Sequence, residues 1–233
     1  MKAREICSPS VSERFREVWR KRSEIEPDIV KSWTNNDWAK GRTRYLTFIA
    51  RVKEKNLVEK IWRIQKQLSS IPCVDSFPKD YLHITVKGCG FLAESVEYED
   101  DIPIENLQTI VDQAKEILHT PRFRIHLPKL NLFPSVVFLE VHDNGRIGEL
   151  NRKLQSISEI GKMRFDYPFL LPHISVAQFQ NDKEFGRLVS FLEKLRAVEF
   201  GEMTTDSIEL AIAHLNGRYP QLEPIHTFQL EQS

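Results

Sequence analysis

Residues 81–87 read Tyr-Leu-His-Ile-Thr-Val-Lys, and residues 171–177 read Leu-Pro-His-Ile-Ser-Val-Ala. Each stretch carries a histidine, an apolar residue and a hydroxyl residue in the same order, inside an apolar run that is typical of a β-strand. Alternate residues of a strand lie on the same face. Each stretch is therefore predicted to present its histidine and its hydroxyl on one face and its apolar side chains on the other.

His83 and His173 are ninety positions apart, and the sequence around them repeats at the same offset. The same shift places residues 46–49 on residues 136–139 and aligns the helical pattern that follows each of them. An apolar strand, a helix and a histidine strand thus recur in one register, which is typical of an internal duplication. The repeated surroundings matter because two short triplets alone carry a high false-positive risk.

The composition restricts the kinds of partner that the chain can have. Its 33 Lys plus Arg equal its 33 Asp plus Glu, so there is no general basic field for nucleic-acid binding, and an anionic ligand needs a local patch. The three cysteines are odd in number and not spaced for zinc, which favours a reducing compartment. No apolar run approaches the ~18 residues of a membrane span, and the N-terminal stretch lacks a signal sequence. We therefore expect a cytoplasmic location without a membrane partner, and the nucleus stays open.

Residues 1–43 are charged and have no counterpart in the repeat, so we interpret them as an N-terminal helical appendage. Residues 10–13 have the spacing of a capping box, and apolar residues at helical intervals predict a helix over about residues 12–25. Its arginines are candidates for nucleic-acid contact, but a charged helix face is more often solvated. Trp33 and Trp38 are expected to attach the appendage to the main body.

Residues 44–233 are predicted to form one bilobal domain of two interleaved lobes. Apolar strand patterns alternate with helical patterns, and no long linker separates the halves. These patterns predict an α+β fold with pseudo-twofold symmetry, in which two mainly antiparallel sheets face a central cleft and the helices lie outside. Ligands usually bind in such clefts, so we expect both histidines there.

Two histidines in one cleft can act as a neutral base and a charged acid, because imidazole titrates near neutral pH. This pair is suited to in-line attack on a phosphodiester, a reaction that needs neither a metal nor another cofactor. Thr85 and Ser175 share the faces of the two histidines and are expected to donate hydrogen bonds to the phosphate oxygens. Lys87 is predicted to face the cleft as well and to add a positive charge there.

The two triplets, the proline at position 172 and the spacing make the sequence similar to the 2H phosphoesterases, which include 2′-5′ RNA ligases and RNA 2′,3′-cyclic phosphodiesterases. The resemblance extends over residues 44–231. It implies a bilobal fold with both triplets in a central cleft, acting on cyclic phosphates or 2′-5′ linkages at RNA ends or in small nucleotides. The functional residues that it implies are His83, Thr85, His173 and Ser175.

The chain departs from the ligase branch of this family at three places. Residues 87–91 read Lys-Gly-Cys-Gly-Phe where that branch often has Phe-Leu-Gly, and Gln178 stands where an arginine is common. Ser175 replaces a threonine but keeps a hydroxyl donor. These departures leave the acid–base pair in place, and they leave the ligase subclass and the substrate open.

A nucleotide substrate also needs a binding site for its base, and aromatic side chains provide one by stacking. The candidates are Tyr45, Phe48, Phe133 and Tyr219, for each of which core packing is the alternative. Asp80 and Asp166 lie near the histidine strands in sequence, where a carboxylate could orient an imidazole.

The favoured function is that of a metal-independent phosphodiesterase that opens 2′,3′-cyclic phosphates on RNA ends or nucleotides. In this hypothesis His173 is the base and His83 is the acid. One alternative is hydrolysis or ligation of 2′-5′ linkages in RNA or oligoadenylate. A second alternative is a non-catalytic RNA-binding module. In each case the expected partner is RNA or a small nucleotide.

Overall fold

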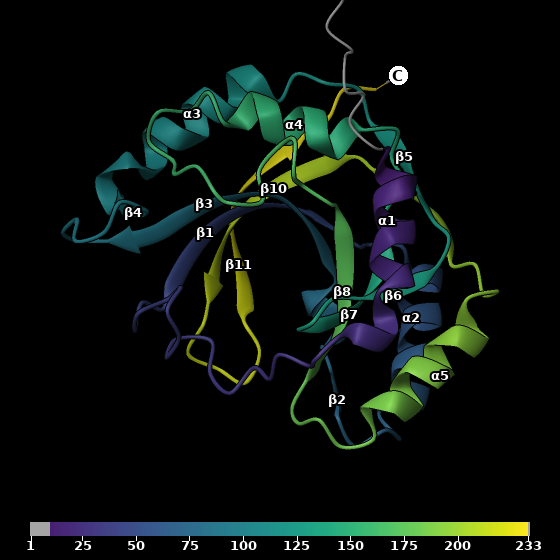
Figure 1. The fold of residues 1–233 in the computed structure, drawn as a ribbon. Helices are drawn as coiled ribbons and strands as arrows, with labels where there is room; N and C mark the ends of the chain where they lie inside the picture. Colours follow the sequence, from purple (N-terminus) through teal and green to yellow (C-terminus); the bar gives the residue numbers. More distant parts are fainter. Residues whose placement is uncertain (1–9, 233) are drawn as a thin grey trace, which may run out of the picture.

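The centre of the fold is one bent β-sheet of nine strands, in which seven follow the order β11-β10-β1-β3-β8-β7-β6 (Figure 1). The structure is a computed structural model that describes residues 10–232. One half of the sheet contains β1 (Arg44–Arg51), β3 (His83–Ala93), β4 (Asp101–Pro103), β10 (Ser207–His214) and β11 (Gln221–Gln229). The other half contains β2 (Val74–Ser76), β6 (Leu130–Leu132), β7 (Val136–Glu140) and β8 (His173–Phe179).

The two halves confirm the predicted α+β class with mainly antiparallel lobes. Neighbouring strands of the sheet pair antiparallel except β3 and β4, which pair parallel. Among the described residues, the halves are joined where β3 pairs with β8, and Ile84 and Ile174 are the pair that joins them. The two lobes are thus two arms of one continuous sheet that meet at the two histidine strands.

Each repeat places its helix on the opposite half of the sheet. Helix α2 (Lys55–Leu68) follows β1 in the chain but contacts β2 and β8, whereas α4 (Arg146–Leu154) follows β7 but contacts β3. Helix α3 (Leu107–Ile117) lies beside α4, and α5 (Phe185–Leu195) contacts β6 (Figure 1). The two repeats therefore exchange their helices across the sheet.

The main hydrophobic core lies between these helices and the sheet. Ile84 and Ile174 belong to it, together with Leu57, Ile61 and Leu154 on the inward faces of α2 and α4. Helix α4 ends at Leu154, whereas the offset of ninety aligns the end of α2, Leu68, with position 158. A separate two-stranded sheet of β5 (Phe123–Leu127) and β9 (Gly201–Thr205) completes the strands. No helix in the described part of the chain is long and apolar enough to cross a membrane.

The strand pairing corrects the repeat by one residue before the histidine strands. Arg51 of β1 pairs with His83, and Glu140 of β7 pairs with His173, so the first strands correspond at an offset of 89 rather than 90. A shift of one residue moves a side chain to the other face of a sheet. Phe138 therefore lies on the face of the histidines, although the offset of ninety aligned it with the core residue Phe48.

The N-terminal segment packs against the sheet on the face opposite to the main core. Helix α1 (Val11–Arg20) begins with the predicted capping box, in which Ser10 is the N-cap and Glu13 reaches back to it. The helix predicted to continue to about residue 25 ends at Arg20, and a short 3-10 turn follows it at Arg22–Glu24. The ring of Phe15 lies 5.9 Å from that of Phe138 on β7, and its carbonyl accepts a hydrogen bond of 3.1 Å from Asn131.

The two tryptophans attach the segment as expected. Trp33 donates from its indole nitrogen to the carbonyl of Arg218 at 3.2 Å. Trp38 packs on Tyr45 and Phe91, with centroids 4.8 and 4.9 Å away. The appendage therefore shares aromatic contacts with both halves of the sheet.

Candidate active site

The pairing of Ile84 with Ile174 places both histidine triplets on the same face of the sheet. Both isoleucines point into the main core, so their neighbours in the two strands point to the opposite face, which we call the inner face. Continuing the register by one residue puts His83 across from Ser175 and His173 across from Thr85. Diagonal neighbours in such a ladder lie roughly 7–8 Å apart. The structure therefore brings the four predicted catalytic residues together.

The two imidazoles are held in the same way. The Nδ1 atom of His83 lies 2.5 Å from the carbonyl oxygen of Tyr81, and Nδ1 of His173 lies 2.9 Å from that of Leu171. A carbonyl can only accept, so Nδ1 of each ring is the protonated donor, and Nε2 is left to exchange a proton with a ligand. The hydroxyl of Thr85 lies 3.4 Å from Nε2 of His83, on the side where that ligand would bind.

Burial lowers the pKa of both histidines. The pKa of His83 falls to about 4, chiefly because the ring is desolvated, with smaller contributions from the positive charges of Arg51 and His173. Desolvation also lowers the pKa of His173. The effect of His173 on the pKa of His83 is consistent with the short separation that the strand register gives. Because the pKa of each ring lies below its ordinary value, both rings are largely neutral at neutral pH.

The neighbours of the two histidines differ in charge. Arg51 pairs with His83 across β1 and β3, whereas Glu140 pairs with His173 across β7 and β8. Both are held by partners: Arg51 binds Glu209 at 2.9 Å, and Glu140 binds Arg196 at 2.7 Å. The offset of ninety does not align Arg51 with Glu140, so the sequence repeat alone gave no sign of this pair. The strand pairing shows that they occupy equivalent positions in the two lobes.

A cavity of about 270 Å³ opens beside the first histidine. His83 and Thr85 line it, whereas His173 and Ser175 lie outside its lining. Two exposed aromatic side chains, Trp38 and Phe165, also belong to the lining. The remaining aromatic residues of the lining are Trp33, Tyr45 and Tyr81. A planar, partly apolar ligand fits these walls, because aromatic faces stack on one another.

The structure corrects the predicted role of Lys87. A β-bulge at Val86 interrupts the alternation, since Thr85 pairs with Ile49 but Lys87 pairs with the next residue, Phe48. The side chain of Lys87 is therefore fully buried. Its ammonium donates to the carbonyls of Gly88 and Gly161 and to the carboxylate of Asp166, at 2.6, 2.7 and 2.8 Å. With all three donors used, Lys87 cannot contribute a free charge to the inner face.

The aromatic candidates for base binding lie in different parts of the structure. Phe48 lies in the main core with no exposure and packs on Phe228, so it cannot contact a ligand. Tyr45 lines the cavity, and Phe133 packs edge-on against His173 with centroids 5.1 Å apart. Tyr219 lines a separate hollow and donates its hydroxyl to Asp75 at 2.5 Å.

Neither aspartate that was considered for orienting an imidazole has that role in the structure. The carboxylate of Asp166 binds Lys87 and Asn151, and the backbone carbonyl of Asp80 accepts from Arg51. The backbone carbonyls of Tyr81 and Leu171 orient the rings instead. A sequence pattern does not show such backbone partners. Within residues 10–232, no three His, Cys, Asp or Glu side chains are grouped as metal ligands.

The fold and the paired histidine strands define the class of protein. A family model described as the 2′-5′ RNA ligase superfamily matches residues 54–217, which is more than half of the chain. The chain belongs to this superfamily, that of the 2H phosphoesterases, and it is a hydrolase of phosphodiesters.

An archaeal protein and two bacterial structures are similar to the chain. An RNA 2′,3′-cyclic phosphodiesterase of Archaeoglobus fulgidus is 24% identical over 188 residues, covering 78% of this chain and 98% of that protein. The crystal structure of TT0787 of Thermus thermophilus has a TM-score of 0.63 at 18% identity, covering 81% of this chain and 99% of that one. Escherichia coli LigT in complex with 3′-AMP has a TM-score of 0.58 at 14% identity, covering 82% and 99%. These two structures show the same fold.

Proposed function

We propose that the protein hydrolyses 2′,3′-cyclic phosphates at RNA ends or in nucleotides, without a metal ion. The observation that carries this proposal is the arrangement of the two imidazoles. Nδ1 of each ring donates to a backbone carbonyl, so Nε2 can bind a ligand. The strand register puts the two rings on one face, each near a hydroxyl. The name of the Archaeoglobus relative supports the same substrate class.

In the proposed reaction a water molecule attacks the phosphorus in line with the leaving ribose oxygen. One neutral imidazole takes a proton from the water as the new P–O bond forms. The other imidazole, protonated at Nε2, gives its proton to the ribose oxygen as the old P–O bond breaks. The hydroxyls of Thr85 and Ser175 stabilise the charge on the non-bridging oxygens. The product is a phosphomonoester, and proton exchange with solvent restores the histidines.

The charges beside the rings favour His83 as the base and His173 as the acid. Arg51 opposes a positive charge on His83, so this ring stays neutral more readily. No cation contributes to the lowered pKa of His173, and the acidic Glu140 occupies the matching position beside it. A bound phosphate anion raises the pKa of both rings, and the proton then resides preferentially on His173. This proposal reverses the roles that we expected from the sequence.

The cavity beside His83 supports a nucleotide substrate. Its aromatic walls suit the stacking of a base, which is worth about 1–3 kcal/mol in single-stranded nucleic-acid complexes. Trp38 and Phe165 are 41% and 66% exposed, so a base can reach their rings from solvent. We propose that Trp38, Phe165 and Tyr45 bind the nucleotide base by stacking.

The proposal is tested with 2′,3′-cyclic AMP and with a 2′-5′ oligoadenylate as parallel substrates. The variants His83→Ala and His173→Ala should each lose at least about a hundredfold in kcat on the cyclic nucleotide. His119→Ala is the matched control, because that histidine is exposed beside Glu231 and does not line the cavity. Wild-type rates in both single variants would refute the acid–base pair. Turnover of the oligoadenylate alone would favour the 2′-5′ alternative, which the family description also supports.

A further inference from the structure

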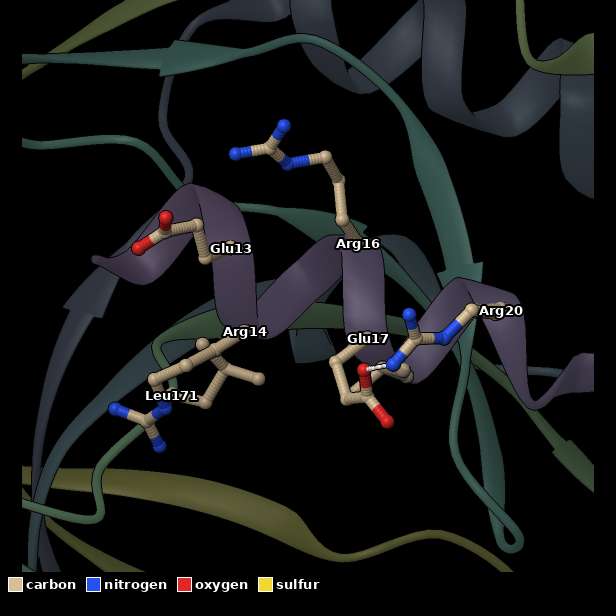
Figure 2. A pocket seen from close by; sticks show the side chains of 7 residues that line it. Glu13, Arg14, Arg16, Glu17, Arg20 and Leu171 are labelled. Atoms are coloured by element: carbon tan, nitrogen blue, oxygen red, sulfur yellow. Dashed lines mark hydrogen bonds and ion pairs between the residues drawn. The ribbon is translucent and has the colours of Figure 1, made fainter. Parts of the chain in front are cut away.

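Helix α1 lies outside residues 54–217, and its basic residues have no role in the proposed chemistry. An open groove of about 910 Å³ lies along the helix. Figure 2 shows the side chains that line it. The residues that line the groove are Glu13, Arg14, Arg16, Glu17, Val18, Arg20 and Leu171. Arg20 pairs with Glu17, and Arg16 points away from Leu171. With three cations and two carboxylates, this groove is a poor site for a polyanion. The contacts of Arg14 are more informative.

Arg14 binds three successive backbone carbonyls of the segment that leads into β8. One guanidinium nitrogen donates to Leu170 at 2.8 Å and to Pro168 at 3.2 Å, and the other donates to Phe169. Arginine is suited to this task, because its planar fork presents several donors in fixed directions. Pro168 and Phe169 are exposed and Leu170 is half-buried, so this one side chain from α1 fixes much of their backbone.

The segment that Arg14 holds continues directly into the support of the second histidine. Leu171 follows Leu170, and its carbonyl oxygen accepts the Nδ1–H of His173 at 2.9 Å. A displacement of residues 168–170 therefore moves the atom that sets the tautomer and the orientation of the His173 ring.

Helix α1 also reaches His173 along a second route. Phe15 follows Arg14 and packs on Phe138, whose ring centroid lies 5.2 Å from that of His173. Helix α1 therefore supports both the carbonyl that binds Nδ1 of His173 and the Phe138 ring that packs against the imidazole.

We propose that Arg14 is a positioning residue for His173, so that the N-terminal helix is part of the active site. The first histidine provides an internal reference. Its Nδ1 binds the carbonyl of Tyr81 in the short turn of residues 79–81, and α1 makes no hydrogen bond to that turn. Loss of Arg14 should therefore disturb His173 and leave His83 unchanged. The kinetic part of this inference rests on the proposed function, but the structural part does not.

The test compares Arg14→Ala with Arg16→Ala, an exposed arginine two positions along the same helix. Arg14→Ala should lower kcat about 10- to 100-fold with little change in KM, because a small misplacement of a catalytic group has effects of this size. Arg16→Ala should retain wild-type kinetics. Arg14→Lys keeps the charge but not the planar fork, so we expect an intermediate kcat, and this variant replaces Arg14→Ala if the latter does not fold.

The second readout is the NMR signal of each imidazole Nδ1–H, assigned with His83→Gln and His173→Gln. In Arg14→Ala the His173 signal should shift or broaden while the His83 signal is retained. Wild-type signals and a wild-type kcat would overturn the proposal, and so would equal loss of both signals. If the wild-type protein does not turn over cyclic nucleotides, the proposed function fails, whereas the NMR comparison still decides the role of Arg14.

Discussion

Ile84 and Ile174 form the residue pair that joins β3 to β8 at the centre of the sheet. Because both side chains point into the main core, the neighbouring residues of both strands face the same side. One apolar pair thus aligns two histidines and two hydroxyls that lie about ninety positions apart in the sequence.

The pH dependence of kcat/KM should show two limbs below neutral pH. If His83 is the base, activity is lost as the pH falls through its pKa of about 4. If His173 is the acid, activity is lost as the pH rises through its pKa, which lies below the usual 6.5. Arg51→Gln removes a positive charge beside His83, so the acidic limb should move to higher pH.

The control for this variant is Arg44→Gln at the other end of β1, where the neighbour across the strands is His214. It should leave both limbs in place. The charge-based assignment of the base would be wrong if Arg51→Gln moved only the upper limb.

Replacement of Lys87 should affect stability far more than substrate binding. Lys87→Met leaves the carboxylate of Asp166 buried without its cation, which costs about 3–5 kcal/mol of unfolding free energy. Urea unfolding measures this loss, and the double variant with Asp166→Asn should recover part of it. Below the unfolding transition, KM for a cyclic nucleotide should stay near the wild-type value. A large rise in KM without a loss of stability would instead support the phosphate-binding role first expected for Lys87.

A side chain at position 88 should be tolerated poorly. A Cβ added at Gly88 would lie 2.2 Å from the hydroxyl oxygen of Tyr45, which lines the cavity beside His83. Gly88→Ala should therefore lower the unfolding free energy by about 1–3 kcal/mol and raise KM. Tyr45→Phe removes the clashing oxygen, so the double variant should be more stable than Gly88→Ala. Strict additivity of the two changes would show that they do not interact.

Residue patterns predicted the α+β class, the paired histidine triplets and the capping box of α1, because each depends on local periodicity or on repetition. They gave the wrong position for Lys87, because the extra residue of the β-bulge at Val86 reverses the alternation just before Lys87. The pairing of Arg51 with His83 and of Glu140 with His173 follows an offset of 89, one residue less than the offset of the histidine strands, and the residue pattern did not reveal this difference.

The contact of Arg14 with residues 168–170 could not be predicted from sequence for a different reason. It joins segments more than 150 positions apart through backbone carbonyls, and these are present at every residue. A sequence pattern records side chains and therefore gives no sign of such partners.

The decisive measurement is a crystal structure with a bound nucleoside 3′-monophosphate. We expect one phosphate on the inner face, with its oxygens within about 3 Å of Nε2 of both His83 and His173. The hydroxyls of Thr85 and Ser175 should bind the remaining oxygens, and the base should stack on Trp38 or Phe165. A phosphate bound in the groove along α1, or to one histidine with the other turned away, would show that the two histidines do not form one phosphate site.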